Sequence, residues 1–251
     1  MNMKVKAILL AGGHGSRLYP FTKYTQKTLL PLHNRPVIDY ALGTIRRAGI
    51  TDITIVSNQF IGQITKHVGA GLPDERIHYV LEEEPTGVAD ALNLARAYNE
   101  DCRLLIYFSD NITTVELTEE VEVFSNAKHP PGCTLLARQE ANPQAFGVAV
   151  LGPNGEVVDI VEKPENPPSN LAIGGIYMFD EQFWSFLDLG VEEKGEKFSI
   201  TDVNRKYIQQ GMAKLITVGE DTWVDCGTPD SLLHASNMAK DGKLNPNPFR
   251  T

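Results

Sequence analysis

The first 110 residues alternate between short apolar runs and helical patterns, and this alternation constrains the fold more than any other feature. Runs of strand length lie at residues 4–10, 53–56, 77–81 and 104–108. Between them, residues 37–45 and 88–98 carry apolar side chains at helical spacing. Strands that alternate with helices pair in parallel, because each helix returns the chain to the edge where the next strand starts. The first half therefore predicts a mostly parallel sheet.

The second half has a different pattern. Strand candidates lie at residues 134–137, 147–151, 157–161 and 173–179, with Pro, Asn and Gly between them. Such turn residues favour antiparallel or mixed pairing. Ser199 with Asp202, and Thr228 with Pro229, mark the starts of two further helices. We expect one α/β domain over residues 1–241 and a loose tail over residues 242–251.

Composition excludes several classes of protein. The chain has 251 residues, 42% of them apolar, which is enough for a substantial core. A net charge of −9 argues against general binding to nucleic acids or membrane surfaces, because an acidic protein repels these polyanions. Three cysteines without CxxC spacing indicate neither a disulfide framework nor a zinc site. No apolar run is long enough for a signal peptide or a membrane span, so we expect a cytoplasmic protein.

A glycine-rich loop follows the first predicted strand. Gly12, Gly13 and Gly15 let backbone N–H groups approach a phosphate without obstruction by side chains. Arg17 adds a charge that can form two hydrogen bonds at once, and Lys27 supplies a second cation next to an apolar segment. The loop matches neither a Walker motif nor GxGxxG, and the alternative is an ordinary glycine turn with a surface arginine.

Two aspartates are candidates for a metal site. Asp110 follows the strand that ends at Phe108, and Asp225 lies between an aromatic strand end and the helix that starts at Thr228. Carboxylates at such positions suit a hard cation such as Mg²⁺. Each could instead be an ordinary turn residue, because aspartate is common in turns.

The run GGHGSRLYPFTKYTQKTLLPL, residues 12–32, resembles the nucleotide-binding signature of sugar-1-phosphate nucleotidylyltransferases, in the form found in bacterial glucose-1-phosphate thymidylyltransferases. The resemblance extends over roughly residues 3–240. It implies a single Rossmann-like, GT-A-like domain with a mixed, mainly parallel central sheet flanked by helices. It also implies a nucleotide-binding half, about residues 1–115, and a sugar-phosphate-binding half with a smaller antiparallel part, residues 116–241.

The resemblance assigns roles on the nucleotide side. The triphosphate would be wrapped by Leu10, Ala11, Gly12, Gly13, Gly15, Ser16 and Arg17. Arg17 and Lys27 would neutralise charge as pyrophosphate leaves, and Asp110 with Asp225 would hold Mg²⁺ as cofactor. The base would be read by Glu82, Pro85 and Gly87.

On the sugar side, the resemblance implies contacts from Asn111, Gly147, Glu162, Lys163, Ile173, Tyr177 and Lys194. Lys163 would pair with the phosphate of the attacking sugar and so belong to the catalytic set with Arg17, Lys27 and Asp110. The sequence departs from the thymidylyltransferase pattern at Phe146, where Tyr is common, and at Lys194, where an Arg stands. Lysine lacks the forked geometry of arginine.

The base is left open by Glu82, which stands where thymidylyltransferases have Gln. A carboxylate accepts hydrogen bonds and does not donate them, so it could take the N3–H of thymine or uracil, or N1–H and N2–H₂ of guanine. Similarity elsewhere favours dTTP with glucose 1-phosphate, then UTP, then GTP. The products would be a nucleotide sugar and pyrophosphate.

Two rivals come from other classes. One is a catalytically inactive protein that binds nucleotide sugars for regulation, and the other is a glycosyltransferase, which would carry an Asp-x-Asp motif that the sequence lacks. A homodimer or homotetramer fits the resemblance. Longer members continue into C-terminal helices that form a regulatory nucleotide site, so we expect weak feedback inhibition in this chain.

Overall fold

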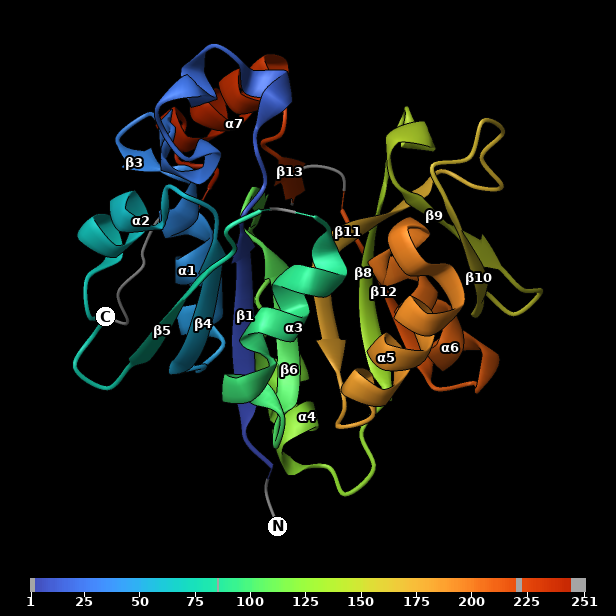
Figure 1. The fold of residues 1–251 in the computed structure, drawn as a ribbon. Coiled ribbons are helices and arrows are strands. Elements are labelled where there is room, and N and C mark those ends of the chain that lie inside the picture. Colours follow the sequence, from blue (N-terminus) through green and yellow to red (C-terminus); the bar gives the residue numbers. More distant parts are fainter. Residues whose placement is uncertain (1–2, 85, 220–222, 245–251) are drawn as a thin grey trace.

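The computed structural model describes residues 3–84, 86–219 and 223–244. A central sheet runs through it, with helices on both faces (Figure 1). The N-terminal part of the sheet consists of β1 (Val5–Ala11), β4 (Asp52–Ser57), β5 (Arg76–Leu81) and β6 (Arg103–Phe108). β1 pairs in parallel with β4 and β6, and β4 pairs in parallel with β5. The α/β class and the parallel first half are confirmed.

The second half adds the strands β8 (Cys133–Gln139), β9 (Gly147–Leu151), β10 (Val157–Glu162), β11 (Leu171–Phe179) and β12 (Ala213–Val218). β11 is antiparallel to β6 and joins the two halves into one mixed sheet. Its first residues pair with β9 and its last with β6. Gly174 and Gly175 lie between these two regions of pairing. The mixed pairing expected for the second half is confirmed, since β12 is parallel to β8 and the other pairs are antiparallel.

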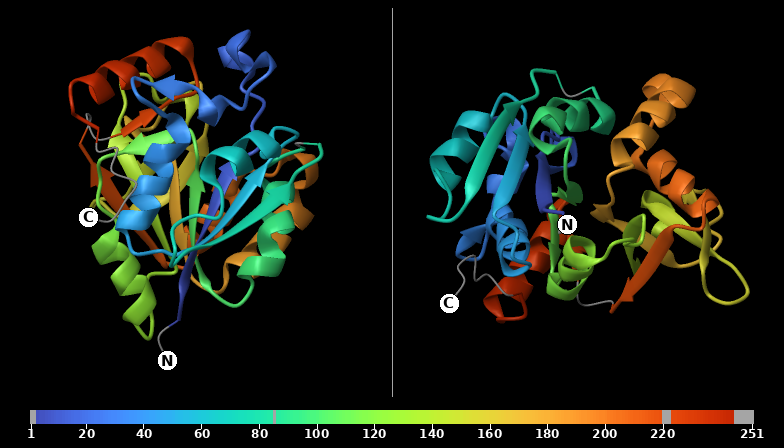
Figure 2. Two further views of the ribbon diagram at one scale, coloured as in Figure 1. Left: turned by 90° about the vertical axis from the view of Figure 1, so that its left-hand side faces the viewer. Right: turned by 90° about the horizontal axis from the view of Figure 1, so that it is seen from below.

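The alternation of side chains along the strands explains the two helical layers. Ile8 and Leu10 point into the cluster that contains α3 (Val88–Asn99), α5 (Phe183–Lys194) and α6 (Ile200–Gln209). Ala7 and Leu9 point to the other face, which is covered by α1 (Val37–Arg47), α2 (Ile61–Val68) and α4 (Thr118–Asn126). Figure 2 shows both layers from two further directions. A sheet buried on both faces requires the near-continuous apolar runs that the sequence contains.

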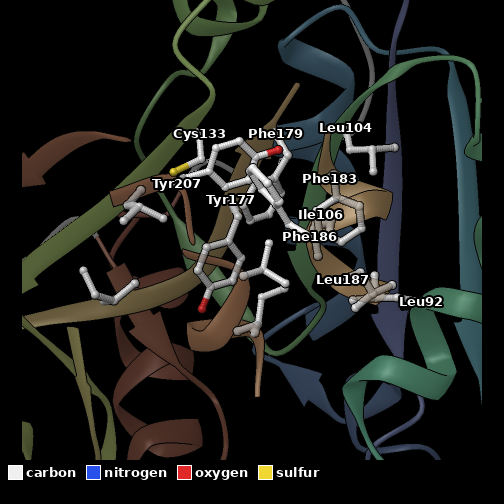
Figure 3. Packing of buried hydrophobic residues seen from close by; sticks show 14 of the residues in the cluster. Leu92, Leu104, Ile106, Cys133, Tyr177, Phe179, Phe183, Phe186, Leu187 and Tyr207 are labelled. Atoms are coloured by element: carbon white, nitrogen blue, oxygen red, sulfur yellow. The ribbon is translucent and has the colours of Figure 1, made fainter. Parts of the chain in front are cut away.

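An aromatic cluster anchors the second half. Tyr177 and Phe179 of β11 pack against Phe183 and Phe186 of α5 and Tyr207 of α6 (Figure 3). The Tyr207 hydroxyl donates a hydrogen bond to Asp180 at 2.7 Å. This bond gives the hydroxyl a partner in a cluster that is otherwise apolar. This cluster holds β11, and with it one wall of the candidate site, against two helices.

A third, smaller cluster lies at the carboxyl end of β1, the upper end in Figure 1. There, α7 (Pro229–Lys240) packs against β2 (Pro31–Leu32), which pairs with β3 (Arg35–Pro36). Close by, β7 (Asn111–Thr113) pairs with β13 (Trp223–Asp225). Leu244, which the sequence analysis placed in the tail, is 1% exposed and belongs to this cluster.

The helix starts predicted at Ser199 and Thr228 are confirmed, and both carry capping boxes. Among the described residues, none of the helices combines the length and the apolar character needed to cross a membrane.

Candidate active site

The glycine loop follows β1, and side chains that donate hydrogen bonds to its backbone carbonyl groups hold it in place. Ser57 donates to the Ala11 carbonyl at 3.1 Å, and Asn58 donates to the Gly12 carbonyl at 2.9 Å. The Gln26 amide also donates to the Ala11 carbonyl. Gly15 has a φ of 65°, a conformation that favours glycine, and begins the 3-10 turn Ser16–Leu18. The loop is thus fixed at the carboxyl edge of the sheet, where α/β proteins bind ligands.

Both predicted cations reach the space beside this loop. Lys27, in the 3-10 turn Lys27–Leu29, forms an ion pair with Oδ2 of Asp110. Arg17 extends to the turn between β13 and α7. A Cβ atom on Gly227 would lie 2.5 Å from Nη2 of Arg17 and 2.6 Å from Oδ1 of Asp225. The absence of a side chain at Gly227 therefore lets Arg17 and Asp225 approach the same point.

The two predicted metal carboxylates are brought together by the β7–β13 pair. Asp225 lies opposite Asn111, and the Cys226 N–H donates to the Asp110 carbonyl at 2.8 Å. Burial, and then the nearby Asp110 charge, raise the pKa of Asp225, while Lys27 and Arg17 act in the opposite direction. Asp110 and Asp225 therefore lie near enough for their charges to interact, and Lys27 and Arg17 partly offset the repulsion between them.

This carboxylate pair fits a magnesium ion. Among the described ranges, no group of three or more His, Cys, Asp or Glu side chains could hold a metal. Magnesium needs no such group, because it typically takes one or two carboxylates and completes its shell with phosphate oxygens and water.

Asn111 directs its side chain to Asp110. Its Nδ2 donates to Oδ1 of Asp110 at 3.0 Å, and its Oδ1 accepts from Nε1 of Trp223 at 2.8 Å and from the Gly175 N–H at 3.3 Å. The Trp223 ring lies over Gly174, where a Cβ would approach it to 0.6 Å. The resemblance implied that Asn111 faces the sugar, whereas its amide is engaged by Asp110, Trp223 and Gly175.

A cavity of about 240 Å³ lies between β9, β11 and the start of α6. Four residues predicted for the sugar site line it, namely Gly147, Glu162, Ile173 and Tyr177. Thr201 of α6 donates to Oε2 of Glu162 at 2.6 Å. A Cβ on Gly147 would lie 3.2 Å from the same oxygen. One Glu162 oxygen is therefore fixed in place at the wall of a small cavity.

The two lysines predicted for the sugar phosphate lie in different places. Lys163 follows Glu162, its side chain is 67% exposed, and its Nζ lies 3.7 Å from Oε1 of Glu162. Its φ of 44° is uncommon outside glycine and is seen at functional sites. Lys194 ends α5 and lines a separate cavity with Glu193 and Arg205. The structure places Lys163 next to Glu162 with an exposed side chain that does not line the cavity, and it leaves Lys194 on another surface.

Glu82 is 4% exposed and lies behind the glycine loop. A Cβ on Gly12 would lie 2.1 Å from its Oε2. Burial, followed by the Asp90 charge, raises the pKa of the Glu82 carboxyl. Gly87 precedes the first residue of α3, and Pro85 lies outside the described residues. The Glu82 carboxyl is therefore buried directly against the backbone of the phosphate loop.

Four neighbouring residues were not predicted as parts of the site. Gln26 supports the loop, Thr201 orients Glu162, Trp223 holds Asn111, and Arg138 donates to the Trp223 carbonyl. A larger cavity of about 800 Å³ is lined by Arg17, Arg138 and Asp225, and it shares Phe146 with the smaller one. The helix start marked by Ser199 and Asp202 could have indicated Thr201. Arg138 left no signal in the sequence.

The glycine loop, the two cations and the two carboxylates lie together at the carboxyl edge of the α/β sheet, an arrangement that suits a phosphate-bearing ligand with its metal. Comparison with known families agrees, because the model described as "Nucleotidyl transferase" matches residues 6–242. The chain belongs to this family. The resemblance to sugar-1-phosphate nucleotidylyltransferases is confirmed, and the chain is an enzyme of that class.

Individual relatives cover nearly the whole chain. It is 35% identical over 238 residues to a glucose-1-phosphate thymidylyltransferase of Xanthomonas campestris pv. campestris, spanning 93% of this chain and 80% of the relative. It is 34% identical over 242 residues to the low-salt glycan biosynthesis nucleotidyltransferase Agl11 of Haloferax volcanii, and the match spans 95% of this chain and 67% of the relative. A Bacillus anthracis crystal structure, provisionally described as a glucose-1-phosphate thymidylyltransferase with sucrose, superimposes with a TM-score of 0.87 at 32% identity and covers 99% of this chain and 98% of its own. The Rossmann-like fold expected from the sequence is confirmed.

Proposed function

We propose that this enzyme joins dTTP to glucose 1-phosphate in the presence of Mg²⁺ and releases pyrophosphate. The observation that carries the proposal is the convergence of Arg17, Lys27, Asp110 and Asp225 beside the glycine loop. Relatives named glucose-1-phosphate thymidylyltransferase, at 31–35% identity over more than nine-tenths of the chain, support the choice of substrates. In this proposal residues 1–115 bind the nucleotide and residues 116–241 bind the sugar phosphate.

Phosphoryl-type transfer depends on positioning and charge neutralisation more than on a protein nucleophile. An oxygen of the sugar phosphate attacks the α-phosphorus in line, and the bond from that phosphorus to the β-phosphate oxygen breaks. Arg17 and Lys27 bind the pyrophosphate as its negative charge develops, while the Gly12, Gly13, Gly15 and Ser16 segment surrounds the triphosphate. The attacking phosphate is already ionised, so no general base is needed.

Asp110 and Asp225 would hold the metal. Family members generally use a divalent metal, and the pair of largely buried carboxylates favours a hard cation that shares its shell with phosphates. When bound, Mg²⁺ would neutralise negative charge on the α-phosphate and the attacking phosphate. Asn111 orients Asp110 for this role.

On the sugar side, Glu162 accepts hydrogen bonds from ring hydroxyls, and Thr201 holds its carboxylate in place. Gly147 leaves room for the ring, and Ile173 and Tyr177 line the same cavity. Lys163 pairs with the phosphate of the attacking sugar. The position of Lys194 beside Glu193 and Arg205 gives no support to a contact with this phosphate.

Glu82 determines how the base is read. As a neutral carboxyl it both donates and accepts, like the amide of glutamine, and so suits thymine or uracil. As a carboxylate it accepts from N3–H of those bases, or from two groups of guanine. The relatives named glucose-1-phosphate thymidylyltransferase support dTTP. UTP and then GTP are the alternatives.

Pyrophosphate release tests the proposal. Purified protein is incubated with Mg²⁺, each of dTTP, UTP and GTP, and a panel of sugar 1-phosphates that includes glucose 1-phosphate. The pair of dTTP and glucose 1-phosphate should give the highest kcat/KM. A preference for another pair would overturn the substrate assignment, and release with none of the pairs would overturn the proposed reaction. A homo-oligomeric state and a cytoplasmic location remain predictions.

A further inference from the structure

We infer that Lys27 acts as a built-in place-holder for the metal, because its ammonium group occupies the oxygen of Asp110 that a divalent cation would use. Lys27 must then leave Asp110 when the metal binds, and it moves to the triphosphate. This inference rests on the proposed metal role of Asp110.

The first step concerns which oxygen of Asp110 is accessible to a cation. Oδ1 of Asp110 accepts the hydrogen bond from Nδ2 of Asn111 at 3.0 Å. This amide cannot turn over, because its own oxygen accepts from Trp223 at 2.8 Å and from the Gly175 N–H at 3.3 Å. Reversing the amide would place an NH₂ group against two donors. The network therefore assigns Oδ1 to Asn111 and directs Oδ2 into the site.

The second step concerns how firmly that network is held. Asn111 is 5% exposed and Trp223 is 3% exposed. Arg138 donates to the Trp223 carbonyl, and its guanidinium lies 5.5 Å from the centre of the Trp223 ring. Gly174 provides the space that the ring fills. A buried amide with all of these partners holds one orientation, so the division between the two Asp110 oxygens is a fixed property of the site.

The third step is the position of Lys27. Its Nζ pairs with Oδ2 of Asp110, and both side chains are mostly buried, at 16% and 12% exposed. The same Nζ would lie 3.2 Å from a Cβ on Gly13, so it also lies against the phosphate loop. A short movement therefore transfers the ammonium from Asp110 to a phosphate bound at that loop. Two cations at one carboxylate oxygen repel each other, so Lys27 and a divalent metal exclude one another there.

Binding of metal and nucleotide is coupled as a consequence. Without nucleotide, a metal has to displace the ammonium group from its ion pair with Asp110. A bound triphosphate supplies that anion and contributes oxygens to the metal. The coupling is reciprocal, as linkage requires, so metal and nucleotide each favour the binding of the other through Lys27.

The test measures Mn²⁺ binding to nucleotide-free protein by electron paramagnetic resonance of free Mn²⁺. The Lys27→Met variant should bind Mn²⁺ about tenfold more tightly than the unaltered protein, because removing one positive charge near the site removes roughly that much repulsion. Lys214→Met, which removes one exposed charge at the start of β12, at the opposite end of the sheet from the site, is the matched control and should leave Mn²⁺ affinity unchanged. Lys27→Gln repeats the test should Lys27→Met fail to fold.

The double variant Lys27→Met with Asp110→Asn separates the possible failures. Tighter Mn²⁺ binding in Lys27→Met that disappears in the double variant supports the inference. Equal or weaker Mn²⁺ binding in Lys27→Met, at a site that Asp110→Asn abolishes, overturns the inference and leaves the proposed metal site intact. If Asp110→Asn changes Mn²⁺ binding neither in the unaltered protein nor in Lys27→Met, the proposed metal site itself is overturned.

Discussion

Replacing Gly12 by alanine should displace Glu82 from its position behind the phosphate loop. The new Cβ would lie 2.1 Å from Oε2 of Glu82, and ordinary contact begins at 3.4 Å, so the oxygen must retreat by about 1.3 Å. Glu82 is 4% exposed, so the protein around it restricts that movement. A hydrogen bond to the base that involves a charged group contributes about 1.5–3 kcal/mol, and its loss lowers kcat/KM for the nucleotide by about 10- to 150-fold.

Steady-state kinetics with dTTP measure the effect, which should appear mainly in the KM for the nucleotide, because the base does not take part in the chemical step. The same substitution in a Glu82→Ala background meets no carboxylate, so its further cost should fall below about 0.5 kcal/mol. Gly62→Ala, where a Cβ meets nothing within 4 Å, is the control for a glycine change in itself. An equal loss from Gly12→Ala in both backgrounds would refute the steric reasoning.

Three further predictions concern single residues. Asp110→Asn should abolish pyrophosphate release while circular dichroism shows an intact fold, and near-normal turnover would remove Asp110 from the metal site. Lys163→Ala should raise the KM for the sugar phosphate much more than the KM for the nucleotide. Unchanged kinetics with the sugar phosphate would contradict the assignment of Lys163. Because burial raises the pKa of Glu82, its contribution to stability is present below the ordinary pKa of glutamate and lost as pH rises through the raised value. Glu82→Gln should therefore raise Tm at about pH 8 and leave it unchanged at about pH 4, and the opposite pH dependence would disprove this reasoning.

Much of the fold could be read from local sequence patterns. The strand predicted over residues 147–151 has these same bounds as β9, and the helix predicted over residues 88–98 is α3, which ends at Asn99. Capping residues also act locally, which is why Ser199 and Thr228 marked helix starts correctly. The carboxyl ends of β1 and β6 could be recognised as the place where ligand-binding side chains would gather.

The finer arrangement of the site could not be predicted, because it depends on contacts between distant parts of the chain. The orientation of Asn111 is set by Trp223, which lies 112 residues away in the sequence. The pairing of Lys27 with Asp110 likewise requires the folded sheet. Leu244 shows the same limit, since nothing periodic surrounds it, and it is buried by packing in the cluster that contains Met238.

The most direct test of nucleotidylyl transfer follows the phosphorus atoms themselves. Phosphorus NMR of a mixture of dTTP, glucose 1-phosphate, Mg²⁺ and the protein should show the two substrates replaced by pyrophosphate and a nucleotide-sugar diphosphate. Adding excess pyrophosphate should drive the same signals backwards to dTTP and glucose 1-phosphate. Release of inorganic phosphate, or formation of pyrophosphate without consumption of the sugar phosphate, would contradict the account.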